Sequence, residues 1–159
     1  MLMRNFLISQ KEEVSKERIT GDEVVLREPL FELAFKRILK RFKPRSKIAL
    51  FSLCTATRPY SKSYKWNLLI KKFGKEVDLV ICSNGGIIPI EYQYCYPFMQ
   101  YDAPHLKAKN QKEIDKLYVD TMVRRMKIFL SKFKYDLVLL NFLSSQRNYR
   151  GGGDNFKLV

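Results

Sequence analysis

The stretch KIALFSLCTATRPYSKSYKWNLLIKKFGKEVDLVICS, residues 47–83, decides the fold. It begins and ends with compact apolar runs, at 47–53 and 77–83, and such runs are typical of buried strands. Between the runs lies an apolar stripe at the helical spacing i, i+3, i+4, i+7, formed by Trp66, Leu69, Ile70 and Phe73. A strand, a helix and a second strand in this order predict a right-handed parallel crossover, the unit of a layered α/β sheet.

The flanking sequence continues this alternation of helices and strands. Approximate helical spacing predicts a helix over about residues 29–42, with Pro29 in its first turn, where the missing N–H costs little. A long helix is expected over about residues 110–133, and YDLVLLNF at 135–142 is the third predicted strand. We therefore expect a three-layer α/β/α fold with a mainly parallel central sheet.

A chain of 159 residues is most simply one domain with one sizeable core. We assign residues 29–143 to the α/β domain. Residues 1–28 are an N-terminal segment of uncertain structure, in which DEVVL suggests a short strand, and residues 144–159 are expected to be a flexible tail.

The composition excludes several classes of protein. No apolar run reaches the roughly 18 residues of a membrane span, and the first residues do not resemble a signal peptide, so we expect a cytoplasmic protein without a membrane partner. Three cysteines without CxxC spacing and a single histidine argue against a disulfide framework and a zinc site. We expect neither a metal nor a cofactor.

The net charge of +14 is the first indication of a partner. Residues 46–75 hold seven basic residues and no acidic one, whereas residues 76–102 hold four acidic residues and no basic one. Positive charge favours binding to polyanions, chiefly through counterion release from phosphates. Nucleic acid is therefore one candidate partner, and a lysine-rich solvated surface without a partner is the alternative.

Two unusual segments follow the carboxyl ends of the first two predicted strands. One is CTATRPYSKS at 54–63, and the other is the long aromatic connection at 84–108. In open α/β sheets ligands bind beyond the carboxyl ends of the strands. We expect the two segments to meet in one place.

The first segment, continued to Trp66, reads Cys-x3-Arg-Pro-Tyr-x2-Ser-x2-Trp and resembles the Pro-Cys-x3-Lys-Pro-Tyr-x2-Ser-x2-His signature of archaeosine synthases. The second segment resembles a Gly-x-x-Pro-x-Glu…Tyr-Pro…Tyr-Asp stretch of the same family, here Gly86, Pro89, Glu91, Tyr96, Pro97, Tyr101 and Asp102. Three signature positions differ and hold Leu53, Arg58 and Trp66. The resemblance covers about residues 47–105, so the chain would be the family's central domain standing alone.

The resemblance implies addition of an amine, lysine in the family, to the nitrile of 7-cyano-7-deazaguanine in tRNA. Cys54 would be the nucleophile, because thiolate addition to a nitrile gives a thioimidate that an amine can displace. Asp102 or Glu91 would transfer protons and hold the amine. The implied substrate-binding residues are Arg58, Tyr60, Ser63, Tyr96 and Tyr101, and Pro59, Gly86 and Pro89 would be structural.

Each role has a structural alternative: a small buried hydrophobe (Cys54), a surface cation (Arg58), a turn (Pro59, Asp102), a helix cap (Ser63), core packing (Trp66), one face of a short strand (Tyr92, Tyr94, Tyr96) and a loop residue (His105). The sequence thus supports two hypotheses. The first is an archaeosine-synthase-like tRNA-modifying enzyme, with a separate transglycosylase-like, PUA-type or radical-enzyme partner. The second is a non-catalytic tRNA-binding module. A nucleobase-excising hydrolase using Glu91 or Asp102 is a weaker third.

Overall fold

A computed structural model describes residues 18–103, 109–142 and 157–158. Its main sheet has five strands in the order β4-β3-β2-β6-β7. The three inner strands are parallel, and they are β2 (Ile48–Leu53), β3 (Asp78–Ser83) and β6 (Leu137–Asn141). The two edge strands are antiparallel to their neighbours, and they are β4 (Gly86–Pro89) and β7 (Lys157–Leu158).

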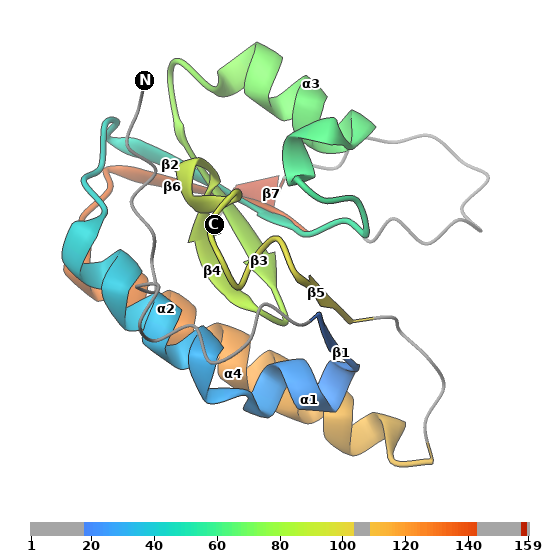
Figure 1. The fold of residues 1–159 in the computed structure, drawn as a ribbon. Helices are drawn as coiled ribbons and strands as arrows, with labels where there is room; N and C mark the ends of the chain where they lie inside the picture. The colour runs from blue at the N-terminus through green and yellow to red at the C-terminus, as the bar shows by residue number, and fades with distance from the viewer. Residues whose placement is uncertain (1–17, 104–108, 143–156, 159) are drawn as a thin grey trace.

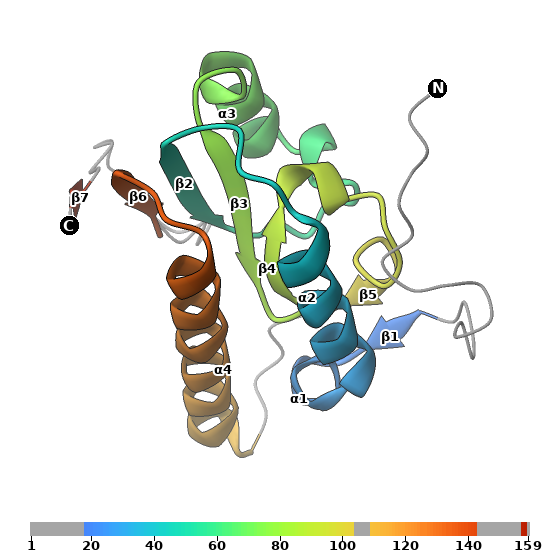
Figure 2. The same cartoon turned by 90° about the vertical axis from the view of Figure 1, so that its left-hand side faces the viewer.

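Helices cover both faces of this sheet, which confirms the predicted α/β class and the mainly parallel sheet. Helix α3 (Tyr64–Phe73) lies on one face, and α2 (Pro29–Arg41) and α4 (Gln111–Lys132) lie on the other (Figures 1 and 2). The middle layer is apolar on both sides, because every residue of β3 is buried. None of the helices among residues 18–103 and 109–142 is long and apolar enough to cross a membrane.

The helices begin and end where the sequence provides suitable residues. Pro29 occupies the first turn of α2, and the Ser63 side chain accepts a hydrogen bond from the backbone N–H of Trp66 at the start of α3. Trp66 itself is fully buried, as its place in the apolar stripe predicts. Gly74 ends α3, because its N–H bonds to Ile70 and a Cβ there would lie 2.6 Å from the Ile70 carbonyl oxygen.

The prediction for DEVVL was wrong, because this segment is helix α1 (Asp22–Arg27) and not a strand. Asp22 and Glu23 suit the positive end of a helix dipole, and Glu23 forms an i,i+4 ion pair with Arg27. The short strand lies just before it, at β1 (Ile19–Thr20), and pairs in parallel with β5 (Tyr101–Asp102).

The connection at 84–108 is more structured than a loop. It contains β4, a 3₁₀ turn η2 (Ile90–Tyr92) and β5, and residues 104–108 with His105 lie outside the described residues. Tyr92, Tyr94 and Tyr96 do not form a strand. The predicted tail, 144–159, is also outside the described residues except for β7.

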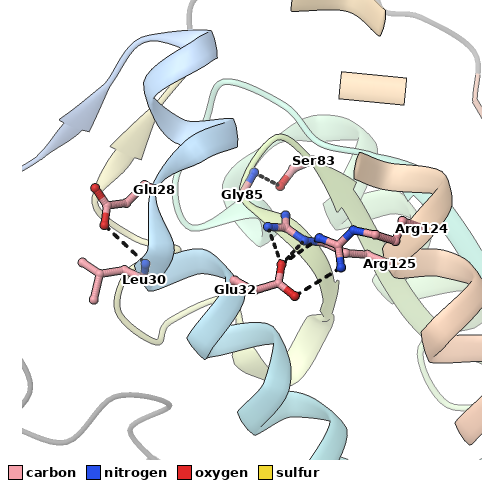
Figure 3. A network of polar contacts seen from close by, with 7 residues as sticks. All are labelled: Glu28, Leu30, Glu32, Ser83, Gly85, Arg124 and Arg125. Carbon is pink, nitrogen blue, oxygen red and sulfur yellow. Dashed lines mark hydrogen bonds and ion pairs between the residues drawn. The ribbon is translucent and has the colours of Figure 1, made fainter. Parts of the chain in front are cut away.

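An ion-pair network fixes α2 against α4 beneath the sheet (Figure 3). Glu32 on α2 accepts hydrogen bonds from Arg124, at 2.9 and 3.2 Å, and from Arg125, at 3.2 and 3.3 Å. Arg125 is buried, with 3% of its side chain exposed, whereas about a third of Glu32 is exposed. The two guanidinium groups hold the pKa of Glu32 below its ordinary value, chiefly through the hydrogen bond from Arg124 and against the effect of burial.

We predict that Glu32→Gln lowers the free energy of unfolding by about 2 kcal/mol at pH 7, because it leaves the buried Arg125 charge uncompensated. Urea unfolding gives this value. The depressed pKa of Glu32 means that its stabilisation is present at neutral pH and is lost as the pH falls through that pKa. The difference between wild type and Glu32→Gln should therefore shrink in acid.

Glu23→Gln is the matched control, because Glu23 forms an exposed ion pair with Arg27 at 3.0 Å. We expect it to change the free energy of unfolding by about 0.5 kcal/mol or less. Equal losses in the two variants would contradict a special role for the buried arginine.

Candidate active site around Cys54

The two segments that the sequence places at the carboxyl edge of the sheet pack against each other, and this prediction is confirmed. The hydroxyl groups of Tyr60 and Tyr101 are hydrogen-bonded. The backbone N–H of Ser61 donates to the Gln93 side chain at 2.8 Å. The loop after β2 and the connection after β3 therefore build one wall at this edge.

A chain of buried hydroxyl groups joins three parts of this wall. The Tyr101 hydroxyl donates to Ser83 Oγ at 2.8 Å, so the Tyr60 hydroxyl is the donor to Tyr101. Ser83 Oγ also accepts the Gly85 N–H at 3.1 Å, at the turn after β3 (Figure 3). Burial raises the pKa of both tyrosines, so they remain neutral donors at physiological pH.

Gly85 is required by the same packing. A Cβ on this residue would lie 3.0 Å from the Phe31 ring and 3.1 Å from the Tyr101 ring. The Phe31 and Tyr101 rings meet edge to face with centroids 5.2 Å apart. The glycine thus allows Tyr101 to approach the turn closely enough to reach Ser83.

Arg58 forms part of the wall and does not extend freely into solvent. Its guanidinium carbon lies 4.3 Å from the Tyr60 ring centroid and 4.4 Å from the Tyr101 ring centroid. Its Nη1 donates to the carbonyl oxygens of Thr55 and Thr57. The arginine therefore closes its own turn, and its Nε is buried with no hydrogen-bond partner among the described residues.

Cys54 is the first residue beyond β2 and is half-buried in this wall. Its backbone N–H donates to the Cys82 carbonyl oxygen at 2.9 Å, which continues the β2–β3 pairing by one residue. Burial raises the pKa of the Cys54 thiol, and the nearby charges of Arg58 and Lys65 oppose that effect. The surroundings are polar and aromatic rather than aliphatic, and the resting group is a thiol.

Two charged residues beside Cys54 were missed by the sequence analysis. Lys65 Nζ donates to the Leu53 carbonyl oxygen at 2.5 Å. Asp22 is buried, accepts a hydrogen bond from Asn84 Nδ2 at 3.3 Å and adds a negative charge that acts on the Cys54 thiol. Lys65 precedes Trp66 in the motif, so the amphipathic pattern of α3 was the signal available for it, whereas nothing in the sequence singled out Asp22.

The two carboxylates expected to serve Cys54 occupy different places. Glu91 follows β4 back to the opposite edge of the sheet, where its charge acts with those of Arg45 and Asp78. The structure therefore does not bring Glu91 together with Cys54. Asp102 stays at the correct edge, but its side chain is turned to Arg18 at 3.4 Å and is 38% exposed.

The remaining predicted residues have structural positions. Ser63 caps α3, Pro59 follows Arg58 in the turn that leads to η1 (Tyr60–Lys62), and Tyr96 is buried in the second segment. Gly86 begins β4 with a φ of 148°, a value that favours glycine, and Pro89 ends that strand. Within the described residues, no group of three or more His, Cys, Asp or Glu side chains could hold a metal ion.

We predict that Tyr101→Phe destabilises the protein by about 1–3 kcal/mol, because the fully buried Tyr60 hydroxyl loses its acceptor. Urea unfolding is the measurement. Tyr94→Phe is the control, since Tyr94 is half exposed and its hydroxyl contacts Ser61 Oγ at the surface. An effect of Tyr101→Phe no larger than that of Tyr94→Phe would contradict the proposed hydroxyl chain.

Comparison with known proteins gives two similarities. Residues 33–150 match the family described as "Domain of unknown function (DUF5591)". The solved crystal structure of AF0587, a protein of unknown function, is 15% identical in sequence, with a TM-score of 0.37, and the match covers 70% of this chain and 43% of that one. The chain thus spans less than half of AF0587. No curated protein matches the chain.

The family match extends over more than half of the chain, from the first turns of α2 past β6, and includes every residue between Cys54 and Tyr101 that builds the wall described above. The chain therefore belongs to the DUF5591 family.

Proposed function

We propose that the protein modifies tRNA in a reaction like that of archaeosine synthase, as the central domain of such an enzyme or one subunit of a split one. The reaction adds an amine, lysine in the family that the motifs resemble, to the nitrile of 7-cyano-7-deazaguanine in tRNA. The observation that carries the proposal is the position of Cys54. Its thiol stands at the carboxyl edge of a parallel sheet, between two cations and the buried tyrosine pair, within the matching motif.

A thiol in this position suits addition to a nitrile. The sulfur attacks the nitrile carbon, an S–C bond forms, and the nitrogen takes up one proton, which gives a thioimidate. The amine then attacks the same carbon, the C–S bond breaks, and the thiol is regenerated with an amidine as the product. No oxidant, reductant or leaving group other than the thiol is needed.

The residues near Cys54 divide the remaining work. Buried neutral tyrosines provide rigid ring faces and hydroxyl donors at the edge, and Arg58 keeps the two rings together. Asp22 takes the place that the sequence analysis gave to Glu91, because its carboxylate is the acidic group that acts on Cys54. Glu91 has no part in this proposal, since it lies at the opposite edge.

The replacement of the signature histidine by Trp66 changes how protons are handled. Trp66 is fully buried, and its ring packs against Tyr60 at a centroid distance of 6.4 Å. An indole cannot exchange a proton as imidazole does at neutral pH. In this chain the motif position therefore supports Tyr60, and another group must transfer the proton.

A second candidate function is a tRNA-binding module without catalysis, and one observation favours it. A hollow of about 440 Å³ lies against α2 and α4, remote from Cys54, and four of its six lining residues are cationic: Leu33, Lys36, Arg37, Leu39, Lys40 and Lys132. Together with the net charge of +14, this hollow suits the phosphates of a nucleic-acid backbone.

The enzyme hypothesis is tested with tRNA that carries the nitrile base and with labelled lysine. We expect incorporation of label into tRNA, alone or with a transglycosylase-like, PUA-type or radical-enzyme partner, and a loss of at least about 100-fold with Cys54→Ala, since the nucleophile is removed. Cys95→Ala is the control, because Cys95 is buried away from the carboxyl edge in the turn after η2. Full activity of Cys54→Ala would contradict the thioimidate route.

The binding hypothesis makes a separate prediction about salt. We expect tRNA affinity to fall steeply with salt, and Lys36→Gln/Lys40→Gln to reduce the salt slope by about two, because two phosphate contacts are removed. Lys71→Gln/Lys72→Gln, on α3 across the sheet, removes the same charge and serves as the control. Equal slopes for the two double variants would contradict binding in the hollow.

A further inference from the structure

We propose that Lys65 is the group that activates Cys54, by holding the thiolate as an ion pair and by delivering a proton to the substrate nitrogen. The inference rests on the proposed function for its substrate, a nitrile, and on the structure for the pairing of the two side chains. It gives the proton transfer, for which this chain lacks the signature histidine, to the residue just before Trp66.

The geometry places the Lys65 ammonium beside the Cys54 backbone. Lys65 is the second residue of α3, directly behind the Ser63 cap, and its side chain returns toward the end of β2. Its Nζ donates to the carbonyl oxygen of Leu53, at 2.5 Å. That carbonyl belongs to the peptide unit whose N–H is the Cys54 N–H, and the N–H is fixed on Cys82. The anchor therefore positions the cation relative to the thiol.

An ammonium has three N–H donors, and the Leu53 carbonyl engages one of them. The Trp66 ring lies 5.6 Å from Nζ and provides an aromatic neighbour to the charge. Lys65 is thus held by its own helix turn and by the end of β2, with donors left for a sulfur or a substrate atom.

Arg58 is the other cation near Cys54, but it is held differently. Its Nη1 bonds to the carbonyl oxygens of Thr55 and Thr57, and its guanidinium is enclosed by the rings of Tyr60 and Tyr101. A guanidinium also keeps its proton throughout the accessible pH range. Arg58 can therefore stabilise charge but cannot transfer a proton, whereas the amine of Lys65 can do both.

The other groups that face Cys54 do not replace Lys65. The charged and titratable groups from the packed elements are Asp22 on α1, Arg58 in the loop, Cys82 on β3, Tyr101 on β5, Tyr118 on α4 and Tyr60 on η1. The tyrosines and Cys82 are neutral because burial raises their pKa values. Asp22 is negative and disfavours a thiolate.

Burial acts on the two partners in a way that favours a pair. Desolvation raises the pKa of Cys54 and lowers that of Lys65, and each charge counteracts the desolvation of the other. Neither ion is favoured alone at this site, but a thiolate and an ammonium in contact lose less solvation than two separate charges. Proton transfer from sulfur to nitrogen is thereby made easier.

The reaction balances with Lys65 as the proton carrier. The thiolate attacks the nitrile carbon, an S–C bond forms, and the nitrile nitrogen takes a proton from the Lys65 ammonium. The neutral Lys65 amine then removes a proton from the incoming substrate ammonium. The freed amine attacks the thioimidate carbon, the C–S bond breaks, and the amidinium product leaves the Cys54 thiolate paired with Lys65.

The test measures the pH dependence of Cys54 alkylation by iodoacetamide, with each cysteine peptide quantified by mass spectrometry. The variants are Lys65→Gln, which keeps a donor for the Leu53 carbonyl but loses the charge, and Lys65→Arg, which restores the charge. Lys62→Gln, an exposed residue of η1, is the control. Alkylation of the fully buried Cys82 reports any unfolding.

We expect Lys65→Gln to move the alkylation midpoint of Cys54 upward by about one pH unit or more and to slow alkylation at pH 7.5 about tenfold, because an opposite charge is lost next to the thiolate. Lys65→Arg should restore the alkylation profile but not lysine incorporation, since arginine cannot transfer the proton. Lys62→Gln should match wild type.

An unchanged alkylation profile in Lys65→Gln, or a Cys54 that does not react in the folded protein, would overturn the inference. These results are distinguishable from failure of the proposed function. If alkylation depends on Lys65 but no lysine enters tRNA, the Cys54–Lys65 pair is supported and the assigned reaction is wrong.

Discussion

The buried hydroxyl chain from Tyr60 through Tyr101 to Ser83 is the interaction on which the rest of this structure depends. It joins the loop after β2, the end of the long connection and the last residue of β3, three segments that would otherwise be independent. Buried hydroxyls that satisfy one another fix a single arrangement, because any other arrangement leaves polar groups unpaired in a low-dielectric environment. The chain thereby holds Arg58 between two rings and keeps Cys54 at the edge of the sheet.

The electrostatics at that edge are consistent with a reactive group that is silent until a substrate arrives. Cys54 is desolvated and flanked by Lys65 and Arg58 on one side and Asp22 on the other, so a thiol is the resting form. A substrate that excludes further solvent strengthens every charge interaction in the site. This arrangement differs from the family pattern that the sequence resembles, because a lysine on α3 takes over from the histidine that Trp66 replaces. The basic surface of the remainder of the chain provides attraction for a polyanion independently of that chemistry.

Much of the fold could be predicted, because local signals and tertiary packing agree there. The apolar runs became β2, β3 and β6, and Pro29, Ser63 and Gly74 bound their helices as expected. The failures have physical reasons. DEVVL is too short for its period to separate strand from helix, and packing of Val25 and Leu26 onto the core selects the helix. Glu91 was misplaced because β4 was read as loop, and a strand that reverses direction carries its successor to the opposite edge. Asp22 and Lys65 reach Cys54 only through tertiary structure.

The most direct test of the central claim, that the two segments form one reactive site with Cys54 as its nucleophile, is capture of the covalent intermediate. tRNA carrying the nitrile base is incubated with the protein without amine, the complex is denatured, and the adduct is mapped by tandem mass spectrometry. Our account predicts a nucleobase adduct on the Cys54 peptide that disappears when lysine is added before denaturation. No adduct, or an adduct on Cys82 or Cys95, would contradict it.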